Sequence, residues 1–291
     1  MRAWRCRFWP PMSFPHKVAS KVLWTRPLPQ LRILWTYRVS PFRHPRVFAR
    51  LVLQDRELSN FTYGLANVDE LVEFVASCLG RPPAEIAAYM REIEADDELD
   101  DALRRRLAGR RDRNPIPLFG RRLGWYCFAR AAKPRLAVET GTADGLGTAL
   151  LARALELNAA EGAPGELLSF DIDARSGWLL STRAREGVHL IVGDARETLP
   201  RALEGRQIDL FVHDSDHSYQ HERWELDFAV DHGATSLVLI SDNAHATPAL
   251  REVCDRVEAT FHYFQEQPVD HFYPGAGIGM ALVRRSPGAG L

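Results

Sequence analysis

Residues 135–285 alternate between short apolar runs and amphipathic helical segments, and this alternation limits the chain to few folds. Apolar runs of strand length lie at 135–141, 166–172, 188–194, 208–214 and 236–242, with predicted helices at 145–160, 174–186, 196–203, 218–230 and 248–257. Such alternation predicts a mostly parallel sheet with helices on both faces. Two last strands, 261–267 and 278–285, have little room for a helix between them. We therefore expect a Rossmann-like α/β fold, a seven-stranded sheet with one antiparallel strand near the edge.

The chain before this alternation has two parts of different composition. Residues 1–50 contain eleven Arg and Lys, seven Pro, four Trp and no acidic residue, which predicts a basic extension that is irregular or disordered. Residues 51–117 carry helical patterns at about 67–79, 84–94 and 98–108, followed by a linker rich in charge and proline. The α/β domain is expected at 118–291, with an amphipathic helix leading into its first strand.

Charge is distributed unevenly along the chain. After residue 50, 26 basic residues stand against 38 acidic ones, a balance of about −12, although the whole chain carries −1. A basic arm on an acidic body is suited to peripheral contact with a membrane surface. A start site placed too early, with Met12 as one alternative, also accounts for such an arm, whereas a transit peptide fits its Trp and Pro content less well.

The cysteines and the hydropathy indicate the cell compartment. The four cysteines are scattered and form no Cys-x-x-Cys pair, as expected for reduced thiols (Cys6, Cys78, Cys127 and Cys254). No apolar run approaches the ~20 residues that cross a bilayer, and no signal peptide is evident. These features predict a cytoplasmic protein without a transmembrane segment.

Acidic residues recur where the predicted strands end, at five successive positions: Glu139, Asp171, Asp194, Asp214 and Asp242. In open parallel sheets, ligands bind in the crevice beyond the carboxyl ends of the strands. One acid at a strand end is explained by helix capping, but five in succession predict a binding site.

The turn after the first strand carries the pattern Glu139-x-Gly141-x-x-x-Gly145-x-Gly147, which departs from the dinucleotide fingerprint. Its glycines let a backbone approach a ligand closely and let the next helix begin tightly. The loop has no Lys or Arg and contains Asp144, which argues against a pyrophosphate. A ligand with a positive or neutral centre fits better, and the sulfonium and ammonium groups of S-adenosylmethionine (SAM) meet that condition.

Two further acids are placed to contact a nucleoside. Asp171 can accept hydrogen bonds from a ribose diol, with Asp173 as the competing residue for this task. Asp194 can receive the exocyclic amine of adenine. Helix capping is the alternative explanation for both Asp171 and Asp194.

The reactive candidates follow the fourth and fifth strands of the alternation. Asp214, Asp242 and the Asn243 carbonyl offer hard oxygen ligands that suit Mg²⁺, and a bound ion lowers the pKa of a hydroxyl. His217, three residues after Asp214, has an ordinary pKa suited to a general base, with a capping or surface histidine as the alternative. His217 and His221 stand at i, i+4 helical spacing, which would supply half of a metal site, but His221 is expected to point away.

The chain resembles class I SAM-dependent methyltransferases over about residues 118–285. Val138-Glu-Thr-Gly141 matches the cofactor motif of that class, Ser169-Phe-Asp171 its ribose-binding acid, and Gly193-Asp194 the stretch beside the adenine. Asp214-Ser-Asp-His-Ser-Tyr219 is similar to the Asp-x-Asp-His-Ser-Tyr motif of a branch that includes O-methyltransferases of macrolide sugars. Ser241-Asp-Asn243 resembles the magnesium-binding Asp-Asn pair of catechol-type O-methyltransferases, in which a lysine replaces His217.

This resemblance implies an O-methyltransferase that uses SAM and Mg²⁺ and transfers a methyl group to a hydroxyl of a small molecule. Cofactor binding would fall on Glu139, Gly141, Gly145, Asp171 and Asp194, metal binding on Asp214, Asp242 and Asn243, and catalysis on His217. Helical additions like 51–117 serve relatives as substrate lids or as contacts of a homo-oligomer. We expect no nucleic-acid partner.

Three other functions remain compatible with these residues. A metal-dependent hydrolase would use Asp214, His217, His221 and Asp242 around a water-activating ion. A non-catalytic protein of the same fold would bind partners through the basic arm and the helical region. A nicotinamide dehydrogenase is disfavoured by the glycine spacing.

Overall fold

The computed structural model describes residues 40–42, 45, 48, 62–110, 113–269, 271, 273 and 275–285 of the 291-residue chain. The basic extension predicted for residues 1–50 therefore lies almost entirely outside the described residues. The part of the chain that the structure describes contains no helix long and apolar enough to span a membrane.

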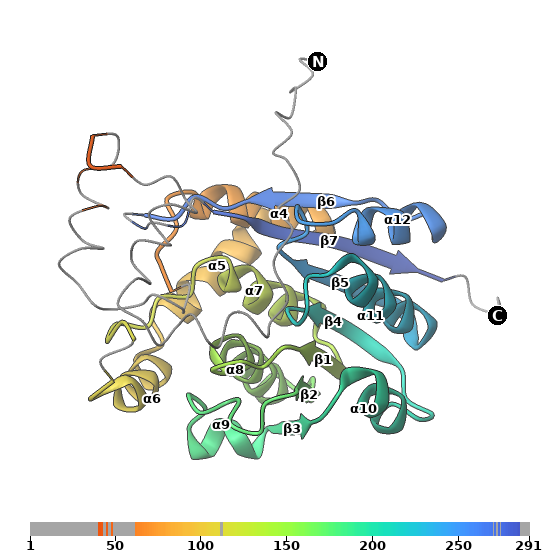
Figure 1. Ribbon diagram of the computed structural model, residues 1–291, viewed down its shortest axis with the longest axis horizontal. Coiled ribbons are helices and arrows are strands. Elements are labelled where there is room, and N and C mark those ends of the chain that lie inside the picture. Colours follow the sequence, from red (N-terminus) through yellow and green to blue (C-terminus); the bar gives the residue numbers. More distant parts are fainter. Residues whose placement is uncertain are drawn as a thin grey trace.

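Seven strands form one sheet in the order β3-β2-β1-β4-β5-β7-β6 (Figure 1). They are β1 (Leu136–Thr140), β2 (Glu166–Asp171), β3 (Val188–Val192), β4 (Ile208–His213), β5 (Gly233–Asp242), β6 (His262–Gln265) and β7 (Gly277–Arg284). Strands β1 to β5 are parallel, whereas β7 runs antiparallel to both of its neighbours, β5 and β6. The predicted fold class is thus confirmed, with the antiparallel strand one position from the edge.

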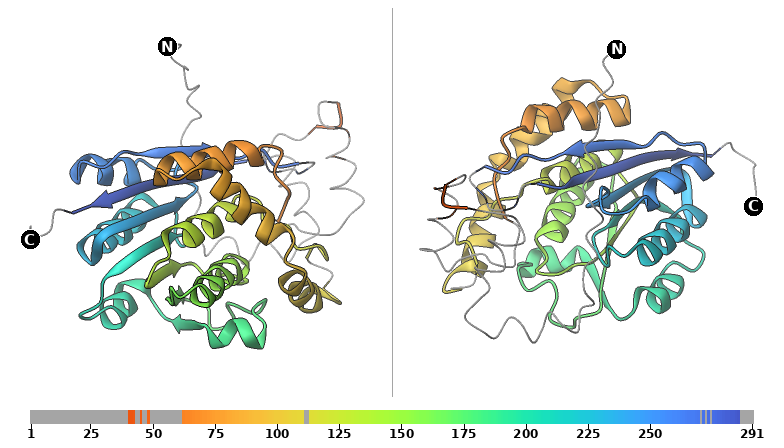
Figure 2. Two further views of the ribbon diagram at one scale, coloured as in Figure 1. Left: turned by 180° about the vertical axis from the view of Figure 1, so that it is seen from behind. Right: turned by 45° about the horizontal axis from the view of Figure 1, so that its top comes forward.

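Helices cover both faces of the sheet, as the two further views show (Figure 2). They are α4 (Val68–Leu79), α5 (Pro83–Glu94), α6 (Asp97–Leu107), α7 (Arg122–Ala132), α8 (Leu146–Ala160), α9 (Thr182–Glu186), α10 (Ala195–Ala202), α11 (Tyr219–Asp231) and α12 (Ala249–Arg256). Helices α4, α5, α7 and α8 share a hydrophobic core with one face of the sheet, and α10, α11 and α12 share another core with the opposite face. The two cores sit on opposite faces because side chains alternate along each strand.

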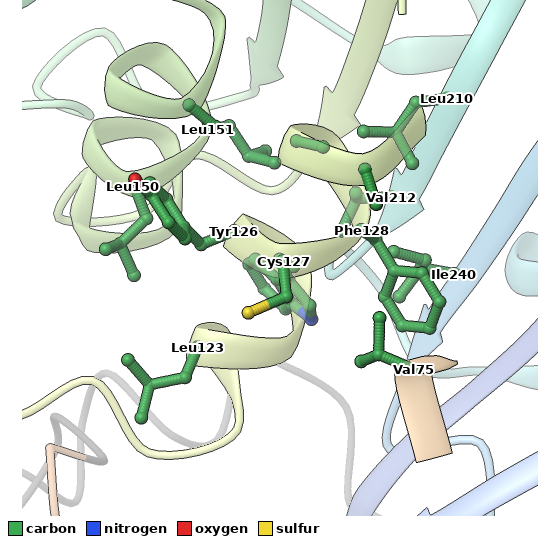
Figure 3. Close-up of a cluster of buried hydrophobic side chains, with 14 of the residues drawn as sticks. Val75, Leu123, Tyr126, Cys127, Phe128, Leu150, Leu151, Leu210, Val212 and Ile240 are labelled. Carbon is green, nitrogen blue, oxygen red and sulfur yellow. The ribbon is translucent and has the colours of Figure 1, made fainter. Parts of the chain in front are cut away.

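The alternation is visible along β1, where Ala137 packs in the first core while Leu136 and Val138 pack in the second. Figure 3 shows part of the first core, in which Phe128 of α7 lies near Val212 and Ile240 of the sheet. Helix α7 is almost wholly buried between the sheet and α4, α5 and α8, and this packing fixes the position of the residues at its start.

One predicted helix is much shorter than expected. The pattern predicts a helix over 174–186, but residues 174–179 form a turn and only α9 is helical. Gly177 has a left-handed φ of 69°, and its N–H donates to Ala143 O at 2.8 Å. Leu179 N donates to Asp144 O at 2.9 Å. These backbone groups support the loop after β1 and are therefore not available to a helix.

Strand register explains which strand ends meet. Thr140 of β1 pairs with His213 of β4, and His213 pairs with Ser241 of β5. The next residue after each partner, Asp214 and Asp242, therefore emerges at the same level of the sheet. We call this edge, at which β1 to β5 end, the carboxyl edge.

Candidate active site

The glycine loop between β1 and α8 is shaped by close backbone contacts. Gly141 has a φ of 93°, and a Cβ at this position would lie 2.1 Å from the carbonyl oxygen of Asp214. Its N–H donates to Phe170 O at 2.8 Å, so the loop bends across the end of β2. Gly145, with a φ of 92°, lies against Gly177. Both glycines are needed here because any side chain would collide with neighbouring backbone.

Glu139 lies beneath this loop, with 1% of its surface exposed. Its Oε2 accepts hydrogen bonds from Thr148 Oγ1 and Ser169 Oγ, both at 2.6 Å. Burial raises the pKa of Glu139 to about 7, although both hydroxyls oppose that change. Its carboxylate organises the end of β1 and the start of α8, and direct contact with a cofactor stays a prediction.

Asp171 and Asp194 lie on neighbouring strand ends and both accept backbone hydrogen bonds. Asp171 Oδ2 accepts from Ala143 N at 2.7 Å, and Oδ1 accepts from Asp173 N at 2.8 Å. Asp194 caps α10 by accepting from Arg196 N at 2.8 Å. A carboxylate oxygen has a second lone pair, so these contacts orient the two acids without using up their capacity to bind a ligand.

Two apolar residues next to these acids are exposed, and the sequence analysis missed them. Ile172 follows Asp171 and is 74% exposed, and Val192 at the end of β3 is 50% exposed. Exposed β-branched side chains beside oriented carboxylates offer a surface on which a planar base can pack. The position of Ile172 directly after the predicted ribose acid was the available signal.

The charge of the glycine loop differs from the expectation. The loop itself carries no cation, but Arg113 from the preceding linker donates to Asp144, Nε to Oδ2 at 3.0 Å. Trp178 Nε1 also donates to Asp144, and the Arg110 guanidinium stacks on the Trp178 ring at 4.3 Å from its centroid. Asp144 therefore has hydrogen-bond and ion-pair partners from outside the loop, which the sequence analysis did not predict.

Asp214, His217 and Asp242 come together at the ends of β4 and β5. One ligand atom from each lies within 4.8 Å of the others. His217 Nε2 is 3.6 Å from Asp214 Oδ1 and 3.1 Å from Asn243 Nδ2. Burial raises the pKa of Asp214 well above its usual range, and the neighbouring Asp242 carboxylate raises it further.

Arg121, which the sequence analysis missed, binds Asp242. Its Nε and Nη2 both donate to the Asp242 carboxylate, Nη2 to Oδ2 at 2.5 Å, and both side chains are buried. The guanidinium holds the pKa of Asp242 below its usual range, although burial alone would raise it. Arg121 lies 121 positions before Asp242. No spacing rule connects such distant residues.

A second buried network behind His217 was also missed. His213 Nδ1 lies 2.6 Å from Glu225 Oε2, and neither side chain is exposed. Burial alone would lower the pKa of His213, but the hydrogen bond and charge of Glu225 raise it above its ordinary value. A histidine inside the apolar run of β4 was a signal for a buried partner.

The two histidine rings are perpendicular, with centroids 5.4 Å apart. Burial, and then the charge of His213, lower the pKa of His217 to about 4. Among the described residues, no hydrogen-bond partner faces His217 Nδ1 or His213 Nε2. His217 is therefore neutral at physiological pH, the state that a general base requires.

His221, the other histidine of this segment, is turned away from the acidic cluster. Its Nε2 lies 2.8 Å from Glu225 Oε1. The cluster of possible metal ligands among the described residues does not include it. The set predicted for a hydrolase, with two histidines on one ion, is therefore not assembled.

Fold and site together define a Rossmann-like α/β protein with oriented carboxylates and a neutral histidine at its carboxyl edge. Residues 138–244 match the family model described as "Methyltransferase domain", which covers a little over a third of the chain. The matched stretch runs from β1 to the residues after β5 and contains every predicted site residue. No curated protein sequence matched the chain.

Several solved structures are similar in fold. The O-methyltransferase TomG of Streptomyces achromogenes, involved in tomaymycin synthesis and in complex with SAM, is 19% identical, with 65% of this chain and 91% of that chain covered and a TM-score of 0.47. An O-methyltransferase of Bacillus cereus in complex with SAH is 15% identical, with 74% and 97% covered and a TM-score of 0.44. A methyltransferase of Geobacter sulfurreducens is 23% identical, with 69% and 96% covered and a TM-score of 0.45.

Proposed function

We propose that the protein is a SAM-dependent O-methyltransferase that acts on a hydroxyl of a small molecule of the sugar or natural-product type. The observation that carries this proposal is the Asp171 carboxylate, which two backbone amides orient beside the glycine loop and the exposed Ile172. The methyltransferase-domain match over the same strands supports it. A cytoplasmic location stays a prediction.

The residues of the carboxyl edge fit an adenosyl group. Asp171 offers acceptors to a ribose diol, Ile172 and Val192 offer apolar surface to adenine, and Asp194 lies beside them. Gly141 and Gly145 let the loop pack closely against neighbouring backbone, which leaves space for a ligand above it. SAM, when bound, supplies an electrophilic methyl carbon on a sulfonium.

His217 is the proposed base. The acceptor hydroxyl loses its proton to His217, its oxygen forms a bond to the methyl carbon, and the electrons of the carbon–sulfur bond remain on sulfur. Burial and the charge of His213 keep His217 unprotonated before this transfer. Most of the acceleration comes from aligning the two reactants. We propose that the helical region before the domain contributes to the acceptor side.

The sequence predicts assistance by Mg²⁺ on Asp214, Asp242 and Asn243, but these residues fit an ion poorly. Arg121 engages both oxygens of Asp242. Asn243 Oδ1, the atom of its side chain that can bind a cation, accepts from Tyr273 OH at 3.3 Å. The proposed methyl transfer therefore involves no metal ion.

The test is calorimetric titration of the full chain with SAM, for the wild type and two variants. Asp171→Asn should weaken SAM binding about tenfold or more, because a hydrogen bond to a charged group contributes about 1.5–3 kcal/mol. Asp173→Asn is the matched control, since Asp173 pairs with Arg175 at 2.8 Å and should leave affinity unchanged. Equal losses in both variants would contradict the assignment.

Turnover is tested separately with labelled SAM and a panel of sugars, polyketides, phenols and lipids. Transfer of label to any hydroxyl supports the enzyme. SAM binding without transfer to any acceptor would favour the non-catalytic alternative. Failure to bind SAM at all would reject the proposal.

A further inference from the structure

Arg121 is the buried cation of the acidic cluster at the carboxyl edge. Its side chain is 4% exposed, while Asp242 and Glu266 are 0% exposed. Nη1 donates to Tyr63 OH at 2.5 Å and to Glu266 Oε1 at 3.3 Å, and the other two nitrogens donate to Asp242. Each nitrogen of the guanidinium thus has an acceptor, and these contacts hold the group in a single orientation.

The partners of Arg121 are themselves fixed. Glu266 Oε2 accepts from Tyr63 OH at 2.7 Å, and Oε1 accepts from Ala276 N at 2.9 Å. Arg121 stands at the start of α7, which is held between the sheet and three other helices. A buried bidentate arginine–carboxylate pair of this kind is a strong interaction, and losing either partner would leave the other charge buried and uncompensated.

A divalent ion at the predicted site would also have to be bound by the Asp242 carboxylate. Asp242 is common to the ligand set predicted from the sequence and to the cluster found in the structure. An ion at Asp242 would compete with two charge-assisted hydrogen bonds and would add two positive charges beside a buried guanidinium. Asn243 Oδ1 already accepts from Tyr273 OH, so among the candidates named above Asp214 and His217 remain as ligands.

We propose that Arg121 replaces a divalent ion as the counter-charge of Asp242, so that this chain binds no Mg²⁺ at Asp214, His217 and Asp242. The consequence for methyl transfer rests on the proposed function, whereas the absence of ion binding can be tested alone. A guanidinium compensates charge but does not coordinate a hydroxyl, so removal of the proton falls to His217. Arg121 acts through Asp242 and is a positioning residue.

The experiment measures binding of Mn²⁺, as a probe for Mg²⁺, by the loss of the free-ion electron paramagnetic resonance signal. The wild-type chain should take up no stoichiometric ion, with or without SAM. Arg121→Met, which removes the charge at similar length, should bind one ion per chain. Adding Asp214→Asn to that variant should abolish the gained site.

Arg130→Met is the matched control, because Arg130 is also a buried arginine of α7 but pairs with Glu92 and Glu161. It should gain no ion. One ion on the wild-type chain, lost in Asp214→Asn, would overturn the proposal, and so would a folded Arg121→Met chain that binds none. If Arg121→Met does not fold, the wild-type result decides alone.

Activity supplies the second readout. Wild-type turnover should be unchanged by a chelator and by added Mg²⁺, and a loss of turnover on chelation that Mg²⁺ restores would overturn the proposal. SAM calorimetry on the same samples separates the two ideas. A chain that binds neither SAM nor Mn²⁺ would reject the proposed function while supporting the role of Arg121.

Discussion

Replacing His213 by glutamine should raise the pKa of His217, because it removes a positive charge close to the proposed base. The rings lie 5.4 Å apart, and two unit charges at that distance interact by about 3 kcal/mol at an effective dielectric constant of about 20. This energy corresponds to a pKa change of about 2. The pKa of His217 should therefore rise above its wild-type value of about 4 in His213→Gln, by at most about 2, while burial, the larger cause, keeps it below the ordinary histidine value.

The variant should fold, because Glu225 keeps other donors. Thr140 Oγ1 at 2.6 Å, Ser215 Oγ at 3.0 Å and His221 all remain in place, and a glutamine amide can donate where the imidazole did. Far-UV circular dichroism would verify this before the titration.

The assay is an NMR titration of the histidine ring signals, with His217 assigned by its disappearance in His217→Gln. His232→Gln is the control, since His232 stacks on Phe228 and bonds its carbonyl oxygen on the far end of α11. A His217 midpoint that stays near 4 in His213→Gln would refute the electrostatic reasoning. A midpoint in the wild type near the ordinary histidine value would refute the lowered pKa itself.

Three further predictions follow from the site. His217→Gln should retain SAM affinity in calorimetry. Its turnover of an acceptor found with labelled SAM should fall by about 10²- to 10⁴-fold, because this is the usual contribution of a general base. Unchanged turnover would show that His217 is not the base. Gly141→Ala should lower the melting temperature strongly or prevent soluble expression, because the added Cβ would lie 2.1 Å from Asp214 O. If the variant melts at the wild-type temperature, the loop can move to accept the side chain. The free energy of unfolding of the wild type should rise as the pH increases from about 4 to about 6.5, because in this range His217 is protonated in the unfolded chain and not in the folded chain. Urea titrations at several pH values should show a shallower rise with pH in His217→Gln than in the wild type.

Local patterns in the sequence were sufficient for the fold. The helices and strands lie within a few residues of their expected bounds, apart from the segment 174–186, because alternation and helical periodicity report how each segment buries its apolar side. Crossover rules then restrict the order of parallel strands. The turn at Gly177 escaped prediction because its hydrogen-bond partners, Ala143 and Asp144, belong to a loop in another part of the chain.

By itself, the sequence determined the sheet and the gathering of acids at one edge, since parallel strands must end together and Asp214 and Asp242 follow neighbouring strands. Only the tertiary structure decided what those acids can do. Arg121 reaches Asp242, Arg113 reaches Asp144, and Glu225 reaches His213. Each of these pairs depends on how a helix or linker packs on the sheet, and in a buried site such partners, rather than the acids alone, set charge and pKa.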